Sequence, residues 1–364
     1  MRTAPAPSAG GRHSGATIGD DWISFHVFYH NDDLDHLLAG FVLPTVQRLL
    51  REGRLETFFF VRYWLGGPHL RLRLLPRPGC ADLVRRRVRQ RAADFLRRCP
   101  SPAALSATAI REANRSLADP EARGREDLVG VDNSCHEVPF EPEIERYGGP
   151  ELLPHSLDFF ALSSCRALQL LPERGGGAEA RWLATALRMR ARLALGFAAG
   201  GEALEELAEA KPIMPAALRA RVEMRADQAF AAREAAFTAL LAEEARRACR
   251  ERSPLADAGL AWRLSWELRR GESGARLRIL CSHLHMTANR LGLRNVDEVY
   301  LSRILWRSVR AMASSQPARW AELQRLLARR SAARRAPRPR LRELVPLVLA
   351  STLEPRARGA EATT

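Results

Sequence analysis

The stretch that decides the fold runs Phe58-Phe59-Phe60-Val61-Arg62-Tyr63-Trp64-Leu65-Gly66-Gly67-Pro68-His69-Leu70-Arg71-Leu72-Arg73-Leu74-Leu75. Its first half is aromatic and β-branched, and the Gly-Gly-Pro tripeptide that follows suits a chain reversal, so two antiparallel strands are predicted. In the second strand leucines alternate with His69, Arg71 and Arg73, which places these polar side chains on one face. Arg62 on the partner strand is a candidate fourth member of this polar face.

The polar face has two interpretations. Arginine forks bind planar anions through two parallel hydrogen bonds, so a face with Arg71 and Arg73 in register suits a carboxylate or a polarised ester. An ordinary solvated sheet face would show the same alternation. The spacing alone does not decide between them.

Segments on either side of this hairpin complete an α+β fold. Trp22–Tyr29 is predicted to be a strand, and residues 34–51 carry an apolar helical stripe. His26 is either a site residue or a satisfied sheet histidine, and the second interpretation is preferred. Strand, helix and two strands form a sheet with a helix on one face. Helical periodicity covers Cys80 to Leu117 and recurs beyond Pro154, near residues 156–171, 178–198, 216–250, 256–269 and 272–293. The predicted architecture is an N-terminal β-sheet with packed helices, followed by a largely helical C-terminal half.

Composition excludes several classes of protein. The 364 residues can bury a full core, and the formal net charge of +15 comes almost wholly from arginine, because Lys211 is the only lysine. This charge permits an acidic peptide or RNA as a partner. No apolar run reaches the ~18 residues of a membrane span, and the N-terminus lacks the apolar core of a secretory signal. Six cysteines without a CxxC motif indicate reduced thiols and a cytoplasmic location.

A second informative stretch is His136–Gly149, in which prolines and a Gly-Gly pair predict an extended, turning loop. Five charged or phenolic side chains occur within seven positions of it: Glu141, Glu143, Glu145, Arg146 and Tyr147. A salt-bridged surface loop is one interpretation. A functional loop is the other, because loops carry binding and catalytic groups disproportionately.

A third cluster lies on the predicted helix Glu272–Leu293. His285 sits beside the apolar stripe, and Asn289 follows one turn later on the same side. His283 falls about 200° around the helix from His285, and Cys281 with His285 makes only a pair, so no metal site is predicted. His285 is either an acid or base at the margin of the core or a core histidine bonded to Asn289.

Together these blocks resemble a known family. The motifs that carry the resemblance are Trp22…His26-Val27-Phe28-Tyr29-His30, Val61-Arg62-Tyr63-Trp64…His69-Leu70-Arg71-Leu72-Arg73, Pro142-Glu143-Ile144-Glu145-Arg146-Tyr147-Gly148-Gly149 and His285-Met286-Thr287-Ala288-Asn289-Arg290-Leu291-Gly292. In this order they are similar to the C-terminal domain of the lantibiotic dehydratases, above all to small stand-alone members of thiopeptide-type bacteriocin biosynthesis. The resemblance spans roughly Trp22 to Met312. We expect a disordered tail over 1–20, an elimination domain over 21–316, a helical extension over 317–352 and a second tail over 353–364.

The resemblance implies glutamate elimination. In the family, a separate glutamylating subunit esterifies Ser or Thr of a ribosomally made precursor peptide with glutamate from glutamyl-tRNA, and the elimination domain leaves dehydroalanine or dehydrobutyrine. Only the partner is expected to use the tRNA, and no cofactor, metal or membrane is expected. The positions matching the family's active site are Arg71, Arg73, Arg146 and His285, with Glu143 weaker, and the expected substrate-binding residues are Arg62, His69, Tyr147 and Asn289.

The residue chemistry agrees with a lyase. β-Elimination needs a base near the Cα proton, stabilisation of enolate-like charge, and help for the departing carboxylate, which arginines supply. His285 could take the Cα proton or protonate the leaving group, and the sequence does not say which. Two alternatives remain: a pyridine synthase catalysing a formal aza-[4+2] cycloaddition on a dehydrated peptide, and a non-catalytic peptide- or tRNA-binding partner of a glutamylase. Oligomeric state is open.

Overall fold

The computed structural model describes residues 19–31, 34–102, 105–116, 123–174, 179–250, 253, 255–332 and 340–353. The two predicted disordered tails lie almost wholly outside these residues. Within the described ranges, no helix combines the length and the apolar character needed to cross a bilayer.

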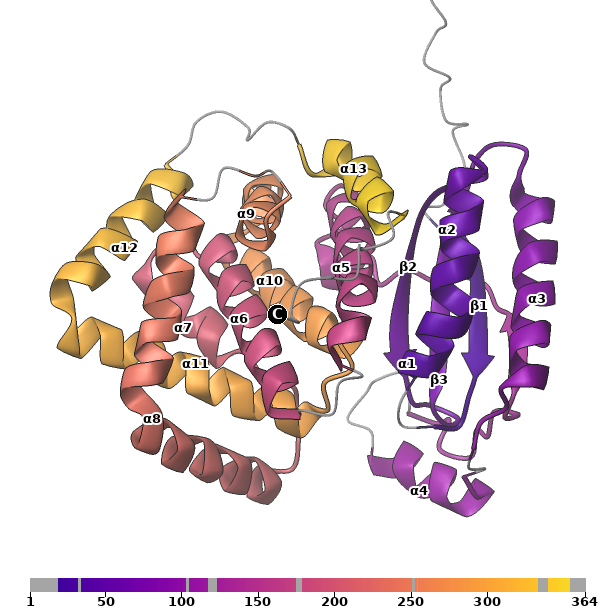
Figure 1. Ribbon diagram of the computed structural model, residues 1–364, viewed down its shortest axis with the longest axis horizontal. Helices are drawn as coiled ribbons and strands as arrows, with labels where there is room; N and C mark the ends of the chain where they lie inside the picture. The colour runs from indigo at the N-terminus through magenta and orange to yellow at the C-terminus, as the bar shows by residue number, and fades with distance from the viewer. Residues whose placement is uncertain are drawn as a thin grey trace, which may run out of the picture.

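A four-stranded antiparallel sheet forms one side of the molecule (Figure 1). Its order is β2-β3-β1-β4, with β1 at Ile23–Phe28, β2 at Leu55–Tyr63, β3 at His69–Pro76 and β4 at Ser134–Glu137. The three strands predicted from the sequence are confirmed. The prediction of an irregular loop from His136 was wrong for the two residues that belong to β4, since this short polar strand carries no apolar alternation.

One face of the sheet is apolar and covered by helices. Leu70, Leu72 and Leu74 are fully buried on it. The predicted helix over 34–51 is divided into α1 (Asp35–Leu37), a π-helical turn (Leu38–Val42) and α2 (Leu43–Arg51). Pro44 lies in the first turn of α2 and lacks the N–H that an uninterrupted helix would use. α3 (Ala81–Arg98) packs beside α2, and α4 (Ala107–Ser116) follows (Figure 1).

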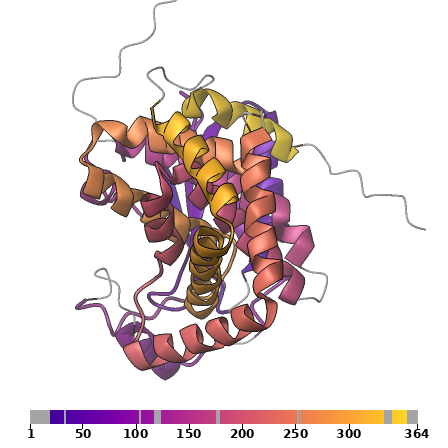
Figure 2. The same ribbon diagram turned by 90° about the vertical axis from the view of Figure 1, so that its left-hand side faces the viewer.

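The remaining helices form the second half of the molecule, as predicted. They are α5 (Leu153–Arg174), α6 (Glu179–Phe197), α7 (Gly201–Glu209), α8 (Ala216–Arg250), α9 (Asp257–Glu267), α10 (Ser273–Arg290), α11 (Asn295–Ser315), α12 (Pro317–Ser331) and α13 (Leu341–Leu353). α5 and α10 lie between the sheet and the outer helices in Figure 1. Figure 2, seen from the helical side, shows α8 and α12 on the outer surface.

The two halves meet along the outer edge of β2. The Phe60 N–H donates to Ser164 Oγ of α5 at 3.1 Å. The Arg62 N–H donates to Asn289 Oδ1 of α10 at 3.0 Å, and Asn289 Nδ2 donates back to the Arg62 carbonyl at 2.8 Å. Side chains of the helical half therefore satisfy the backbone groups that an edge strand leaves exposed.

Candidate functional site

The second face of the sheet carries the polar side chains. The register places Arg71 opposite His26 of β1 and Val61 of β2, and Arg73 opposite Ser24 and Phe59. Because opposed residues share a face, these side chains form one surface together with His69, which lies opposite Phe28 and Tyr63. His69 is only 1% exposed and Arg73 only 7%, so this polar face is largely buried rather than solvated.

Arg71 is held by its neighbours on this face. Its guanidinium carbon lies 3.5 Å from the centroid of the Tyr63 ring, and its Nε donates to His69 Nε2 at 3.4 Å. His69 Nδ1 in turn donates to the Gly67 carbonyl at 2.9 Å, which leaves Nε2 as the acceptor. The positive φ of +106° at Gly67 in the hairpin turn brings that carbonyl into position.

Arg73 is held in a similar way. Its Nη2 lies 3.4 Å from His26 Nε2, and its guanidinium carbon lies 5.3 Å from the Phe140 ring. Burial, with the charges of Arg73, His69 and Arg71, lowers the pKa of His26 to about 2. Burial is also the main cause that lowers the pKa of His69 to about 3. Both imidazoles are therefore neutral near pH 7, and the positive charge of this face comes from its arginines.

Arg62 does not belong to this face, and the prediction that placed it there was wrong. It lies opposite Leu70, so its side chain points to the helix-covered side of the sheet. There it forms an ion pair with Asp35 of α1, and its Nε donates to the Arg290 carbonyl of α10 at 3.2 Å. The pairing register, which depends on the length of the hairpin connection, decides the face.

The loop after β4 connects the polar face to α10. Phe140 packs edge-on against Trp22 and Phe59, with ring centroids 5.9 and 5.8 Å apart. Tyr147 is buried against Phe160 of α5. Its hydroxyl lies 3.0 Å from Ser282 Oγ of α10.

Between these two anchors the loop is charged and half-exposed. Arg146 Nη1 donates to Glu143 Oε1 at 2.8 Å, so these two predicted site residues are brought together. Gly148, with φ of +84°, then turns the chain toward α5.

His285 lies on α10 and contacts a residue that the sequence did not single out. Its Nδ1 is 2.7 Å from Glu298 Oε2 of α11, and its side chain is 34% exposed. Asn289 bonds to the β2 backbone instead of to His285, so the alternative of a core histidine paired with Asn289 is wrong. The core histidine of this helix is His283, which is fully buried and bonds to Ser156 at 3.0 Å.

The three clusters approach one another around α10. Ser282 precedes His285 by three residues and contacts the loop through Tyr147, while Asn289 follows by four and contacts β2 at Arg62. Residues spaced in this way lie on one side of a helix, so His285 stands between the two contacts. Direct reach from His285 to the arginines of the sheet remains a prediction.

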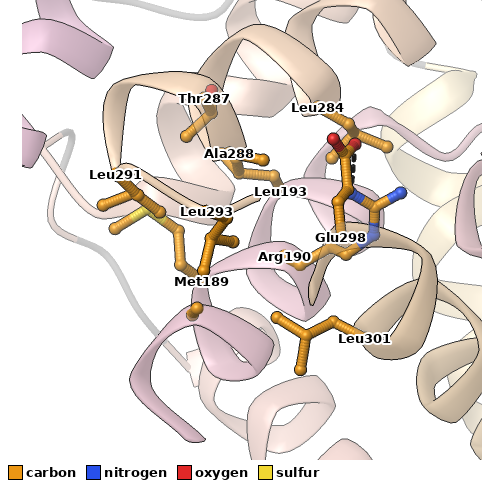
Figure 3. A pocket seen from close by; sticks show the side chains of 11 residues that line it. Met189, Arg190, Leu193, Leu284, Thr287, Ala288, Leu291, Leu293, Glu298 and Leu301 are labelled. Carbon is orange, nitrogen blue, oxygen red and sulfur yellow. Dashed lines mark hydrogen bonds and ion pairs between the residues drawn. The ribbon is translucent and has the colours of Figure 1, made fainter. Parts of the chain in front are cut away.

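A cavity lies in the helical half, and Glu298, which contacts His285, is part of its lining (Figure 3). Its volume is ≈ 10 Å³, about what one water molecule requires, so it cannot hold an amino acid or a peptide. Its walls are mostly apolar side chains from α6, α10 and α11, and its polar members are Thr287 and the ion pair of Arg190 with Glu298. Among the described residues, no three His, Cys, Asp or Glu side chains form a group that could hold a metal ion.

Glu298 and Tyr63 are members of the site that sequence reasoning missed, and His26, for which a satisfied sheet histidine was the preferred interpretation, lies beside Arg73 on the polar face. Glu298 falls in the first turn of α11, where an acidic residue ordinarily serves the helix terminus, so nothing marked it as a partner of His285. Tyr63 lies in the aromatic and β-branched half of the hairpin, where Arg62 was the only predicted site residue. Strand alternation puts Tyr63 and Arg62 on opposite faces, so the prediction that placed Arg62 on the polar face excluded Tyr63 from it.

The chain is similar to known proteins in sequence and in structure. The family model described as "Lantibiotic biosynthesis dehydratase C-term" matches residues 22–309. Among solved structures, the pyridine synthase TbtD from thiomuracin biosynthesis is 19% identical with a TM-score of 0.58, over 81% of this chain and 99% of that one. The tRNA-dependent lantibiotic dehydratase MibB from Microbispora sp. 107891 is 18% identical with a TM-score of 0.53, over 84% of this chain and 29% of that one.

A third solved structure, TsrL, is 15% identical with a TM-score of 0.54, over 86% of this chain and 99% of that one. At these identities the three structures establish a shared fold. Comparison with curated protein sequences finds no match.

Proposed function

The chain belongs to the lantibiotic biosynthesis dehydratase C-terminal family, and we propose that it is a lyase that eliminates glutamate from glutamylated Ser or Thr residues of a precursor peptide. Members of this family are biosynthetic enzymes. The observation that carries the elimination proposal is the largely buried polar face, on which neutral histidines hold Arg71 and Arg73.

The proposed reaction breaks the Cα–H and Cβ–O bonds of the esterified residue and forms the double bond of dehydroalanine or dehydrobutyrine. Glutamate departs as a carboxylate that keeps its second, side-chain carboxylate. Arg71 and Arg73, with Arg146 from the loop, would bind these two groups through charge-assisted forks. His285 would move the proton at Cα.

The other predicted residues receive supporting roles in this proposal. Glu143 holds the Arg146 guanidinium, and His69 holds Arg71. Tyr147 anchors the loop to α10, and Asn289 anchors α10 to β2. These residues would act by positioning the groups that touch the leaving glutamate.

The proposed substrate requires a partner. A glutamylating subunit, using glutamyl-tRNA, would supply the esterified peptide, and this chain would consume it in the cytoplasm. MibB is described as a tRNA-dependent lantibiotic dehydratase, which supports a tRNA-dependent step before this one; this chain spans only 29% of MibB.

A pyridine synthase is the second candidate. The match to TbtD over 99% of that chain supports it. Elimination is preferred because the arginines of the polar face and of the loop suit a departing dicarboxylate, whereas a cycloaddition between two dehydrated residues releases no such anion. A non-catalytic peptide- or tRNA-binding subunit would not need these arginines to be held by neutral imidazoles.

The test uses three synthetic peptides with the purified protein. A glutamyl-Ser peptide should release free glutamate and yield a product one water lighter than the Ser peptide. The unmodified Ser peptide, with or without ATP, should stay unchanged. Ring formation from a peptide with two dehydroalanines, in the absence of glutamate release from the first substrate, would replace elimination by the pyridine synthase function.

A further inference from the structure

A chain of three side chains runs inward from His285. His285 Nδ1 lies 2.7 Å from Glu298 Oε2, and Arg190 Nη1 of α6 donates to Glu298 Oε1 at 3.2 Å. Arg190 also donates to the Ala210 carbonyl, which in turn accepts from Ser302 Oγ at 2.9 Å. Glu298 and Arg190 are buried, and Figure 3 shows their paired head groups at the wall of the cavity.

The pKa of Glu298 decides where the proton of the His285–Glu298 hydrogen bond lies. Burial acts to raise the pKa of Glu298, but the hydrogen bonds and charges of His285 and Arg190 outweigh it and lower that pKa. Glu298 is therefore ionised and can only accept hydrogen bonds. The proton between Glu298 Oε2 and His285 must then sit on Nδ1, so in the neutral ring Nε2 carries the lone pair.

We infer that Glu298 is a positioning residue that fixes the tautomer and the orientation of His285, and that Arg190 fixes Glu298. The part of this inference that concerns catalysis rests on the proposed function. In that setting Nε2 is the atom that takes the Cα proton, and Glu298 stabilises the imidazolium that results. This assigns His285 as the base, the choice that the sequence left open.

Cys281 and Glu206 are further titratable groups near this chain of side chains. Burial is the main cause that raises the pKa of Cys281, which lies one turn before His285 on α10. The charge of Arg190 acts to lower that pKa, and the charge of Glu206 on α7 acts to raise it. Glu206 is exposed, and among the described residues the hydrogen bond and ion pair of His285 go to Glu298 and not to Glu206. It therefore offers a matched control, since Glu206→Gln removes the same charge from the neighbourhood without touching the histidine.

Glu298→Gln gives a sharp expectation. Arg190 would continue to donate to the side-chain oxygen at the Oε1 position, so the amide nitrogen would stand where Oε2 stood, facing His285 Nδ1. An amide nitrogen only donates. The ring would then have to accept at Nδ1 and carry its proton on Nε2, the opposite tautomer.

The first measurement is the long-range ¹H–¹⁵N spectrum of the histidine rings in the ¹⁵N-labelled protein above pH 8, with His285→Ala identifying the signals. Wild type should show a protonated Nδ1, Glu298→Gln a protonated Nε2, and Glu206→Gln the wild-type pattern. A protonated Nε2 in wild type overturns the inference without reference to any variant. An unchanged tautomer in folded Glu298→Gln also overturns it.

The second measurement is glutamate release from a preformed glutamyl peptide. Glu298→Gln should lower the rate by about 10²- to 10⁴-fold, the usual contribution of a general acid or base, while Glu206→Gln remains at the wild-type rate. If the wild-type protein releases no glutamate, the proposed function fails while the ring spectra still decide the tautomer. A tautomer that reverses with no loss of rate in an active enzyme overturns the positioning role.

Discussion

Replacing Arg62 by leucine should lower the free energy of unfolding by about 3 kcal/mol. Breaking a buried ion pair by removing one partner costs about 3–5 kcal/mol, and the Asp35 side chain keeps 16% of its surface exposed, which favours the lower end. The change also removes the donor to the Arg290 carbonyl. The loss is structural because Arg62 lies on the helix-covered side of the sheet.

Equilibrium unfolding in urea, followed by tryptophan fluorescence, measures this loss. Arg71→Leu is the matched comparison on the neighbouring strand, next to Leu70, which pairs with Arg62. It should cost only about 1 kcal/mol, the size of a cation–π contact. Arg62→Leu with Asp35→Leu should recover most of the stability, because removing both charges leaves no buried carboxylate without its guanidinium.

The opposite pattern would refute the reasoning. If Arg62→Leu keeps its stability and loses glutamate release, while Arg71→Leu loses stability and keeps release, then Arg62 binds substrate and Arg71 is structural. The assignment of the two faces to different roles would then be reversed.

Three further predictions concern the site and its titration. Arg73→Lys should lower the rate of glutamate release by about 10²–10³-fold, because an ammonium loses the planar two-point contact, whereas exposed Arg86→Lys should retain the wild-type rate. His285→Ala should accumulate glutamylated peptide in a coupled assay with the glutamylating partner, and mass spectrometry of the peptide distinguishes this from a block before glutamylation. The free energy of unfolding should fall as the pH drops below about 6.5, because His26 and His69 bind protons in the unfolded chain but stay neutral in the folded protein. Each histidine contributes up to about 1.4 kcal/mol per pH unit. Urea titrations from pH 7 to 5 measure the slope.

The sequence predicted the sheet hairpin well because its signals are local. Alternation in β3 and the glycines of the turn are properties of neighbouring residues, and they located Arg71 and Arg73 on one face. The prediction for Arg62 was wrong because the face on which its side chain lies depends on the pairing register across the turn. A single residue of slip would have moved it to the predicted side.

The contacts between distant segments could not be predicted in the same way. His285 and Glu298 belong to successive helices, and Arg190 lies about a hundred positions earlier, so their meeting depends on how α6, α10 and α11 pack. Helical periodicity placed His285 beside the apolar stripe but gave no information about which helix would cover it. The family resemblance located the histidine without its partner.

The amide of Asn289 imitates a further strand. It accepts from the Arg62 N–H and donates to the Arg62 carbonyl, which is the pair of bonds that a neighbouring strand residue would make. Separating the helical half from the sheet would remove both bonds from the backbone of the same residue. The Arg62 amide should therefore exchange its hydrogen as slowly as the interior of β3, and the two halves should melt as one cooperative unit despite their different architectures.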